Sequence, residues 1–263
     1  MKRKQFPFVV LLFSFFIHAC TVNNVTIDEK IGKQFDAKSV KGTFGMFDNS
    51  RGIFTIYDLD RFKQSYSPAE TFNIFNTLVG MHIGRVADEN ALIAAKDTAG
   101  TVKSLTITDA FKSSSTAHFR ELARSIGKDT MKVWVDSVKY GNKTIGNAVD
   151  SFWTNGKITI TPDEQLGMIK RLYFKQLPFR ASVQETVKKM MVVENNSQYQ
   201  LAYQFGLTQQ NGKQITWVLG WVEENMHVYP FVINFEGSTD PLKTGKELTH
   251  DILTYIGFFK GRM

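Results

Sequence analysis

The stretch that decides the fold is residues 67–74, which read SPAETFNI. Ser67 is a residue type that caps helices, and Pro68 suits the first helical position. Glu70 follows the serine by three residues, so the spacing predicts a capping box in which both side chains satisfy free N–H groups of the first turn. Apolar residues then recur at helical spacing, at positions 72, 75, 79 and 83. We therefore expect a helix from Pro68 to about Ile83.

Strand signals lie on both sides of a helical middle. A hairpin is predicted at residues 42–58, where two apolar runs flank a polar turn. Helices are predicted at residues 116–126, 129–139, 161–176 and 182–192, and a final one at 241–259. Strands are predicted at residues 199–207, 215–222 and 228–235. The order predicts an α+β fold, with an antiparallel sheet formed by N- and C-terminal strands and a helical region inserted between them.

The first twenty residues have the organisation of an export signal. Three basic residues at positions 2–4 precede an apolar run at 6–17, and the small residue Ala19 precedes Cys20. The apolar run is shorter than the about 20 residues that span a bilayer. Residues 17–20, IHAC, resemble the bacterial lipobox, although His18 is unusual there. A free cysteine is often a buried core residue, but Cys20 ends a signal, so we expect a lipid on it and a location in the cell envelope.

The length and charge of the chain restrict its domain organisation and its classes of partner. Residues 1–19 are predicted as signal peptide, residues 20–40 as lipid anchor and polar tether, and residues 41–263 as one domain. The net charge of +7 falls to +4 when the three basic residues of the signal are removed, which does not indicate a nucleic-acid partner. One cysteine excludes a disulfide framework. The five histidines have no ligand spacing, so neither a metal nor another cofactor is expected.

Further motifs occur in the order found in one enzyme family. They are YGN at 140–142, DSFW at 150–153, GKITI at 156–160 and WVLGWVE at 217–223. Together with residues 67–74, these motifs resemble the class D β-lactamases in order and spacing from about residue 40 to residue 260. The resemblance implies the fold of the penicillin-recognising serine hydrolases and transpeptidases.

Two positions that would carry the chemistry of that family hold other residues. By the resemblance, the nucleophilic serine falls on Glu70 and the carbamylated lysine that acts as general base falls on Asn73. An asparagine amide does not titrate, so it cannot act as a base. A carboxylate at position 70 would occupy the space and the N–H donors that an oxyanion needs. The covalent route of the family is therefore expected to be lost.

Two further motifs are only partly kept. The Ser-x-Val motif of the family falls on residues 114–116, which retain Ser114, and its Lys-Thr-Gly strand falls on Gln204 to Gly206, which retains the glycine. A literal Lys-Thr-Gly at residues 243–245 opens the last helix, and a Ser-x-x-Lys at 125–128 straddles a helix end. We expect neither to replace the lost groups.

The resemblance also suggests residues that line a ligand cleft. These candidates are Ser114, Tyr140, Asn142, Trp153, Gly206 and Trp217. Each has a purely structural alternative: Ser114 as a helix cap, the Tyr-Gly-Asn run as a helix ending, and the tryptophans as core residues. Glu70 is likewise either part of a capping box or, on the pattern of covalent carboxylate catalysis, a new nucleophile.

Two classes of function follow from the sequence. In the first, the protein is a non-hydrolytic binder that holds a β-lactam, a peptidoglycan fragment or an envelope protein in the old cleft. In the second, it is a β-lactam hydrolase with relocated chemistry. The residues at positions 70, 73 and 204 favour the binder.

The lipid anchor is testable by one substitution. We expect Cys20→Ala to release the protein into the soluble fraction, because the acyl groups would hold it on the membrane. Mass spectrometry of the parent protein should show a lipidated N-terminal Cys20. An unmodified Cys20 in the mature protein would show that the anchor is absent.

Overall fold

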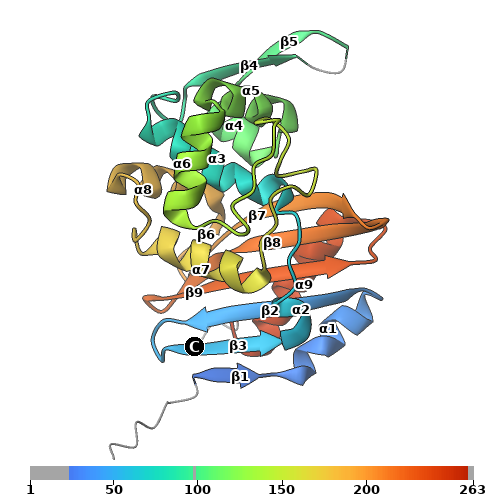
Figure 1. The fold of residues 1–263 in the computed structure, drawn as a ribbon. Helices are drawn as coiled ribbons and strands as arrows, with labels where there is room; N and C mark the ends of the chain where they lie inside the picture. Colours follow the sequence, from blue (N-terminus) through green and yellow to red (C-terminus); the bar gives the residue numbers. More distant parts are fainter. Residues whose placement is uncertain (1–23, 97–98, 260–263) are drawn as a thin grey trace, which may run out of the picture.

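The computed structural model describes residues 24–96 and 99–259, and its main element is a seven-stranded sheet in the order β1-β3-β2-β9-β8-β7-β6 (Figure 1). Cys20 and the predicted signal lie outside the described residues. The strands are β1 (Val25–Ile27), β2 (Lys41–Asp48), β3 (Ile53–Tyr57), β6 (Val192–Asn195), β7 (Tyr199–Gln210), β8 (Lys213–Glu224) and β9 (His227–Glu236). A separate two-stranded sheet pairs β4 (Leu92–Lys96) with β5 (Val102–Thr106).

Helices cover both faces of the large sheet (Figure 1). One face is covered by the N-terminal η1 (Glu29–Ile31) and α1 (Gly32–Ala37) together with the C-terminal α9 (Pro241–Ile256). The other face and the adjoining helical region hold α2 (Leu59–Phe62), η2 (Ala69–Thr71), α3 (Phe72–His82), α4 (Ile107–Lys112), α5 (Thr116–Ile126), α6 (Lys128–Val138), α7 (Pro162–Tyr173) and α8 (Ala181–Met191). Apolar cores therefore lie on both faces of the sheet, which explains why the central strands β2 and β8 are buried along most of their length.

The predicted α+β class and the main helices and hairpins are confirmed. α5 has the predicted bounds, and α7 begins with the expected capping box between Thr161 and Glu164. The β2–β3 hairpin and the β7–β8–β9 meander also lie where the sequence places them. The β4–β5 hairpin and the edge strand β6 were not predicted, because their exposed strands lack clear alternation.

Two predictions about the N-terminal part are wrong. The sheet is mixed rather than purely antiparallel, because β1 pairs in parallel with β3. Most of the predicted tether is folded: Ile31 and Phe35, which are 0% and 1% exposed, pack into the core beneath α9. The apolar residues of this stretch are scattered among polar ones and show no sustained helical period, yet Ile31 and Phe35 suffice to hold the segment on the sheet. The folded unit therefore begins near Val25 rather than at residue 41.

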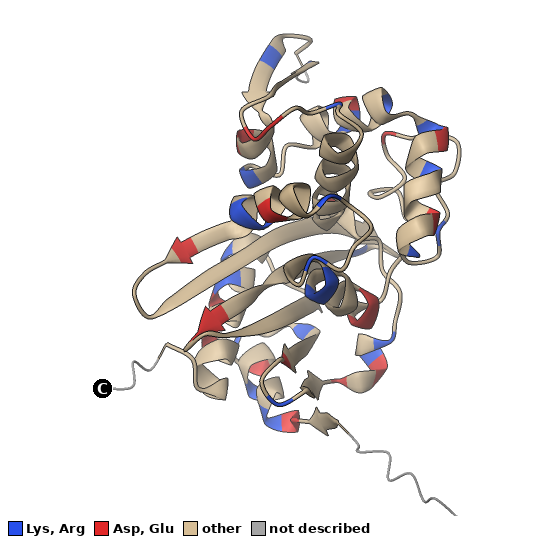
Figure 2. Ribbon diagram, turned by 90° about the vertical axis from the view of Figure 1, so that its left-hand side faces the viewer, with Lys and Arg blue, Asp and Glu red and all other residues tan. Residues whose placement is uncertain are grey.

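Charges on the molecule are mixed. Lys and Arg positions are interspersed with Asp and Glu positions along the ribbon (Figure 2). None of the helices in the described part of the chain is both long and apolar enough to cross a membrane.

Candidate functional site

The helix-opening stretch forms η2 and then α3, but the predicted capping box is not made. The hydroxyl of Ser67 donates to the carbonyl oxygen of Trp153 at 2.6 Å, and no side chain caps η2. Ala69 lies in the left-handed region with φ +51°, which turns the backbone away from a regular first helical turn. Because of this turn, Glu70 is free to face the sheet. The interpretation of Glu70 as a capping residue is wrong.

The carboxylate of Glu70 is bound to the main chain of β7. The N–H of Leu207 donates to Glu70 Oε2 at 2.8 Å, and the hydroxyl of Thr116 lies 3.4 Å from Oε1. This N–H is available because β6 pairs with β7 only at residues 200–202, which leaves the following part of β7 without a strand on that side. Glu70 thus fills a donor that an anionic ligand or intermediate would otherwise use.

Gly206 allows η2 to approach the strand this closely. A Cβ at this position would lie 2.9 Å from the carbonyl oxygen of Pro68 and 3.0 Å from the backbone nitrogen of Thr71. Any other residue would push η2 away from β7. The glycine that the family resemblance retains is therefore required by packing, and it sets the distance between Glu70 and Leu207.

The structure also brings Ser114 and Gln204 together. The Gln204 amide donates from Nε2 to Ser114 Oγ at 2.9 Å and to the carbonyl oxygen of Phe111 at 3.2 Å. Ser114 has φ +51°, so the loop before α5 is held in a conformation that costs energy for a non-glycine residue. The pair is neutral, because an amide stands where the resemblance places a lysine.

Asn73 is sealed in the core below α3. It is 0% exposed, and neither atom of its side-chain amide has a hydrogen-bond partner among the described residues. The same holds for both amide atoms of Asn76 on the next part of the helix. Burial of an unpaired amide is costly, so this region is not optimised for stability. Nothing at position 73 can accept a proton at neutral pH.

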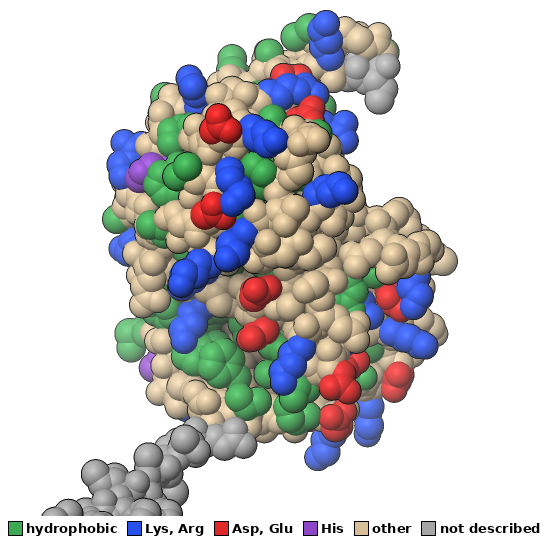
Figure 3. All heavy atoms as spheres, viewed as in Figure 1, with side chains coloured by type: hydrophobic (Ala, Val, Ile, Leu, Met, Phe, Trp, Pro, Cys, Tyr) green, Lys and Arg blue, Asp and Glu red, His purple; other side chains and the backbone are tan. Residues whose placement is uncertain are grey.

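A cavity of ≈ 310 Å³ opens beside Glu70. Thr116 and Arg120 of α5 line one side, and Leu207 and Gln209 of β7 line the other. The outline of the molecule is notched between the helical region and the tip of the β7–β8 hairpin, where this cavity lies (Figure 3). Asn73 is not among the residues that line it.

Three of the proposed cleft residues are core residues instead. Trp153 and Trp217 are 0% exposed: the ring of Trp153 stacks on Phe72, and the indole N–H of Trp217 donates to the carbonyl oxygen of Ser67 at 2.9 Å. Tyr140 is buried as well, and burial raises the pKa of its hydroxyl, which keeps it neutral. Their assignment as ligand platforms is wrong, since their rings are needed to fill the space beneath η2 and α3.

Asn142 belongs to a loop rather than to the cavity. Its side-chain amide donates to the carbonyl oxygen of Lys157 at 3.0 Å and accepts from the N–H groups of Thr144 and Thr159. Gly141 lies so close to Thr159 that a Cβ would be 2.0 Å from its carbonyl oxygen. The Tyr-Gly-Asn run therefore joins two segments that flank the site, and it does not contact the cavity.

The remaining motifs lie away from the cavity. Residues 243–245 are in the first turns of α9, and Ser125 ends α5 while Lys128 begins α6. Within residues 24–96 and 99–259, no group of three or more His, Cys, Asp or Glu side chains is placed to hold a metal ion.

The sequence reasoning missed Leu207 and Arg120. Leu207 acts through its main-chain N–H, and a leucine side chain gives no sign of such a role. Its position directly after the retained Gly206 is the one signal that could have identified it. Arg120 lies four residues after Thr116 on α5, so both face the same side of the helix, but no motif marks it. The arrangement as a whole offers an anchored carboxylate, a guanidinium and neutral hydroxyl and amide groups.

Comparison with known proteins agrees with the fold. The penicillin binding protein transpeptidase domain matches residues 33–254. The probable beta-lactamase YbxI of Bacillus subtilis is 28% identical over 272 residues, covering 97% of this chain and 98% of YbxI. The class D beta-lactamase FUS-1 (OXA-85) of Fusobacterium nucleatum superposes with a TM-score of 0.83 at 30% identity, covering 89% of this chain and 100% of FUS-1. The C-terminal domain of the Bacillus licheniformis BlaR penicillin-receptor superposes with a TM-score of 0.84 at 26% identity, covering 90% and 97%.

The bond between Glu70 and Leu207 is testable by stability. We expect Glu70→Ala to lower the free energy of unfolding by about 1 kcal/mol, because the strand N–H loses its charged acceptor but gains access to water in the cavity. Glu70→Gln keeps a neutral acceptor and should lose less. Chemical denaturation of the three proteins measures the difference. A Glu70→Ala variant that is more stable than the parent would show that the carboxylate is strained there and is retained for function.

Proposed function

Because the chain belongs to the penicillin binding protein transpeptidase domain family and resembles class D β-lactamases over most of its length, we propose that it is a non-hydrolytic binding protein of the cell envelope. The cleft of the fold holds a ligand without forming a covalent bond to it. Cys20 carries the lipid that keeps the protein at a membrane. The observation that carries the proposal is the carboxylate of Glu70 on the N–H of Leu207.

This single contact opposes acyl transfer in two ways. An acyl intermediate of the family needs a nucleophilic hydroxyl, whereas position 70 carries a carboxylate whose Oε2 accepts from the N–H of Leu207. It also needs main-chain donors for the developing oxyanion, and removal of one such donor typically costs a factor of about 10²–10³ in rate. Here the donor is occupied by a negative charge. Acyl transfer is therefore opposed at the nucleophile position and at the main-chain donor, independently of the general base.

The base is missing as well. Asn73 is buried and cannot titrate, and Glu70 accepts from a backbone N–H and lies near a threonine hydroxyl. Neither takes a proton at neutral pH. Loss of nucleophile and base together removes the covalent route rather than slowing it.

A binding role on this fold has a precedent among the relatives. The BlaR domain that superposes on the chain is named a penicillin-receptor, so the fold serves reception as well as hydrolysis. We propose the same kind of role here, with a β-lactam, a peptidoglycan fragment or an envelope protein as the classes of ligand to test. A β-lactam carboxylate would find no lysine at position 204, which is a neutral glutamine, and it would be repelled by the carboxylate of Glu70.

Incubation with benzylpenicillin tests the proposal. The mature protein should show no penicilloyl mass shift by intact-protein mass spectrometry and no turnover of a chromogenic β-lactam, since a glutamate and an asparagine stand at positions 70 and 73, where the resemblance places the nucleophile and the base. Glu70→Ser alone should remain inactive because the serine lacks a base. Glu70→Ser with Asn73→Lys should acylate slowly, and its substrate affinity should stay poor while Gln204 remains.

The opposite result would be clear. A penicilloyl adduct on the unsubstituted chain, or turnover that one substitution abolishes, would identify a relocated nucleophile. The protein would then be a β-lactam hydrolase rather than a binder.

A further inference from the structure

The two charged side chains that line the cavity have opposite signs. Glu70 is fixed at its base by the Leu207 N–H, and Arg120 projects from α5. The other side chains that line it are uncharged. The cavity is therefore lined by one negative and one positive side chain, and its other polar side chains form hydrogen bonds without charge.

Glu70 retains unused acceptor capacity. A carboxylate offers about four acceptor positions. Oε2 receives one strong hydrogen bond from Leu207, whereas Oε1 has only the Thr116 hydroxyl at 3.4 Å. An unfilled, negatively charged oxygen at the wall of a cavity attracts an N–H or ammonium group and repels an anion.

The neighbouring Gln204 does not alter this polarity. Its amide N–H groups are used by Ser114 and by the carbonyl oxygen of Phe111, and its side chain is only 5% exposed. Arg120 is therefore the cationic group that lines the described cavity. A ligand carboxylate has its favourable partner there, away from Glu70.

Resting on the proposed binding function, we infer that the cleft accepts a zwitterionic ligand of the amino acid or short peptide class. Its ammonium lies against Glu70 and its carboxylate against Arg120. This orientation places each charge of the ligand beside the opposite charge of the protein. The cavity volume of ≈ 310 Å³ suits a ligand of a few residues at most.

Matched dipeptides test the orientation. NMR titration of the mature protein with alanyl-alanine, in its L,L and D,D forms, should give a measurable affinity for at least one of them. N-acetyl-alanyl-alanine, which lacks the ammonium, should bind roughly tenfold more weakly. Glu70→Gln should weaken binding of the free dipeptide by a similar factor. The free and the acetylated dipeptide should then bind this variant with equal affinity. Arg120→Gln should instead remove the advantage of the free carboxylate over the C-terminal amide.

Each contrary outcome has a definite meaning. Equal or tighter binding of the acetylated dipeptide to the parent would overturn the inference, as would a preference that survives in Glu70→Gln. Absence of any shift with either free dipeptide would also overturn it. None of these results bears on acylation, which the penicillin experiment decides separately.

A second inference comes from the other end of the sheet, where the described chain begins. Asn24 is tied to the β2–β3 turn: its side-chain amide donates to the carbonyl oxygen of Gly52 at 3.3 Å, and its own carbonyl accepts from the N–H of Phe54 at 2.7 Å. Asn24 is the fourth residue after Cys20. An extended chain of that length spans at most about 14 Å. A lipid on Cys20 would hold this end of the sheet close to the bilayer.

Two hairpin turns at opposite ends of the sheet differ in an informative way. Both have two central residues with positive φ, a geometry that favours Asn-Gly. The β7–β8 turn near the cleft has Asn211-Gly212, with φ +54° and +75°. The β8–β9 turn at the anchor end has Asn225-Met226, with φ +51° and +63°. Met226 is 103% exposed, so neither turn geometry nor packing within the described chain accounts for a methionine there.

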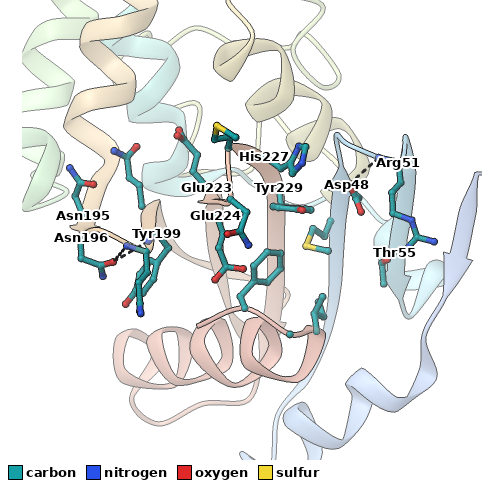
Figure 4. A pocket seen from close by; sticks show the side chains of 18 of the residues that line it. Asp48, Arg51, Thr55, Asn195, Asn196, Tyr199, Glu223, Glu224, His227 and Tyr229 are labelled. Atoms are coloured by element: carbon teal, nitrogen blue, oxygen red, sulfur yellow. Dashed lines mark hydrogen bonds between the residues drawn. The ribbon is translucent and has the colours of Figure 1, made fainter. Parts of the chain in front are cut away.

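The β8–β9 turn lies beside the β2–β3 turn, because the N–H of Asn49 donates to the carbonyl oxygen of Val228. The charged side chains at this end carry both signs: Asp48, Glu223 and Glu224 stand with Arg51 around a large open pocket (Figure 4). Contact with a bilayer would therefore depend on the apolar side chain rather than on net charge.

The geometry points to a membrane-facing end formed by the β2–β3 and β8–β9 turns, with Met226 inserted into the bilayer interface. This rests on the lipid on Cys20 that forms part of the proposed function. Leu207 lies eight residues along β7 from that end and five strands away from β1, which places the cleft about 35 Å from Asn24. The lipid and Met226 together would hold the cleft away from the membrane.

Chemical acylation tests this without relying on cellular processing. Cys20 is the only cysteine, so a single-chain alkyl maleimide modifies the mature protein at one site. One acyl chain gives only marginal, reversible binding to phosphatidylcholine vesicles, which makes a second contact measurable by co-sedimentation. Met226→Gly should lower the partition several-fold while leaving the denaturation midpoint unchanged or raised, because glycine suits the turn. Leu92→Ser, at an apolar residue 69% exposed on the β4–β5 hairpin, is the matched control and should not change it.

An unchanged partition in Met226→Gly would overturn this orientation. An equal loss in Leu92→Ser would also overturn it, since the contact would then be unspecific. Neither outcome depends on whether cells acylate Cys20, because the alkyl chain is attached in vitro.

Discussion

The close approach of η2 to β7 at Gly206 is the constraint on which the site depends. The absence of a side chain there lets the backbone of Pro68 and Thr71 lie against the strand. The main chain at Ala69 takes a left-handed conformation to make the turn. Together these features aim residue 70 at the N–H of Leu207 whatever its side chain is. A serine placed there would lie beside a donor for an oxyanion, whereas the glutamate present satisfies that donor itself.

Much of the scaffold could be predicted from local patterns. The capped start of α7, the bounds of α5 and the Asn-Gly turn between β7 and β8 follow from side chains that act on their own backbone. The capping box at Ser67 fails although its residues have the same spacing as those at Thr161. The difference is tertiary: the carbonyl of Trp153 takes the Ser67 hydroxyl, and the carboxylate of Glu70 turns to the strand. The spacing of two residues therefore predicts a capping box, but tertiary packing determines whether its hydrogen bonds form.

The site was only partly visible in the sequence for a similar reason. Glu70, Ser114, Gln204 and Gly206 could be located because the resemblance fixed their positions along the chain. The N–H of Leu207 is a main-chain group whose availability depends on where β6 stops pairing, which no side chain encodes. The roles of the tryptophans were ambiguous, because the sequence alone does not distinguish a ring that fills a core from a ring that lines a cleft. Their complete burial required the structure.

Buried polar groups without hydrogen-bond partners and those with partners lie in different parts of the site. The amides of Asn73 and Asn76 are buried without partners in the described chain, in the region that the resemblance associates with the base. Near the cavity, by contrast, Gln204 donates to Ser114, and Oε2 of Glu70 accepts from Leu207. An unpaired buried amide costs stability, and the energy recovered at Glu70 offsets part of that cost. A carboxylate that satisfies the strand N–H therefore stabilises the cleft as a shape while reversing its charge. In the binding role proposed for this chain, the cleft keeps a place for a ligand, while a carboxylate and an amide stand where the resemblance places the reacting groups.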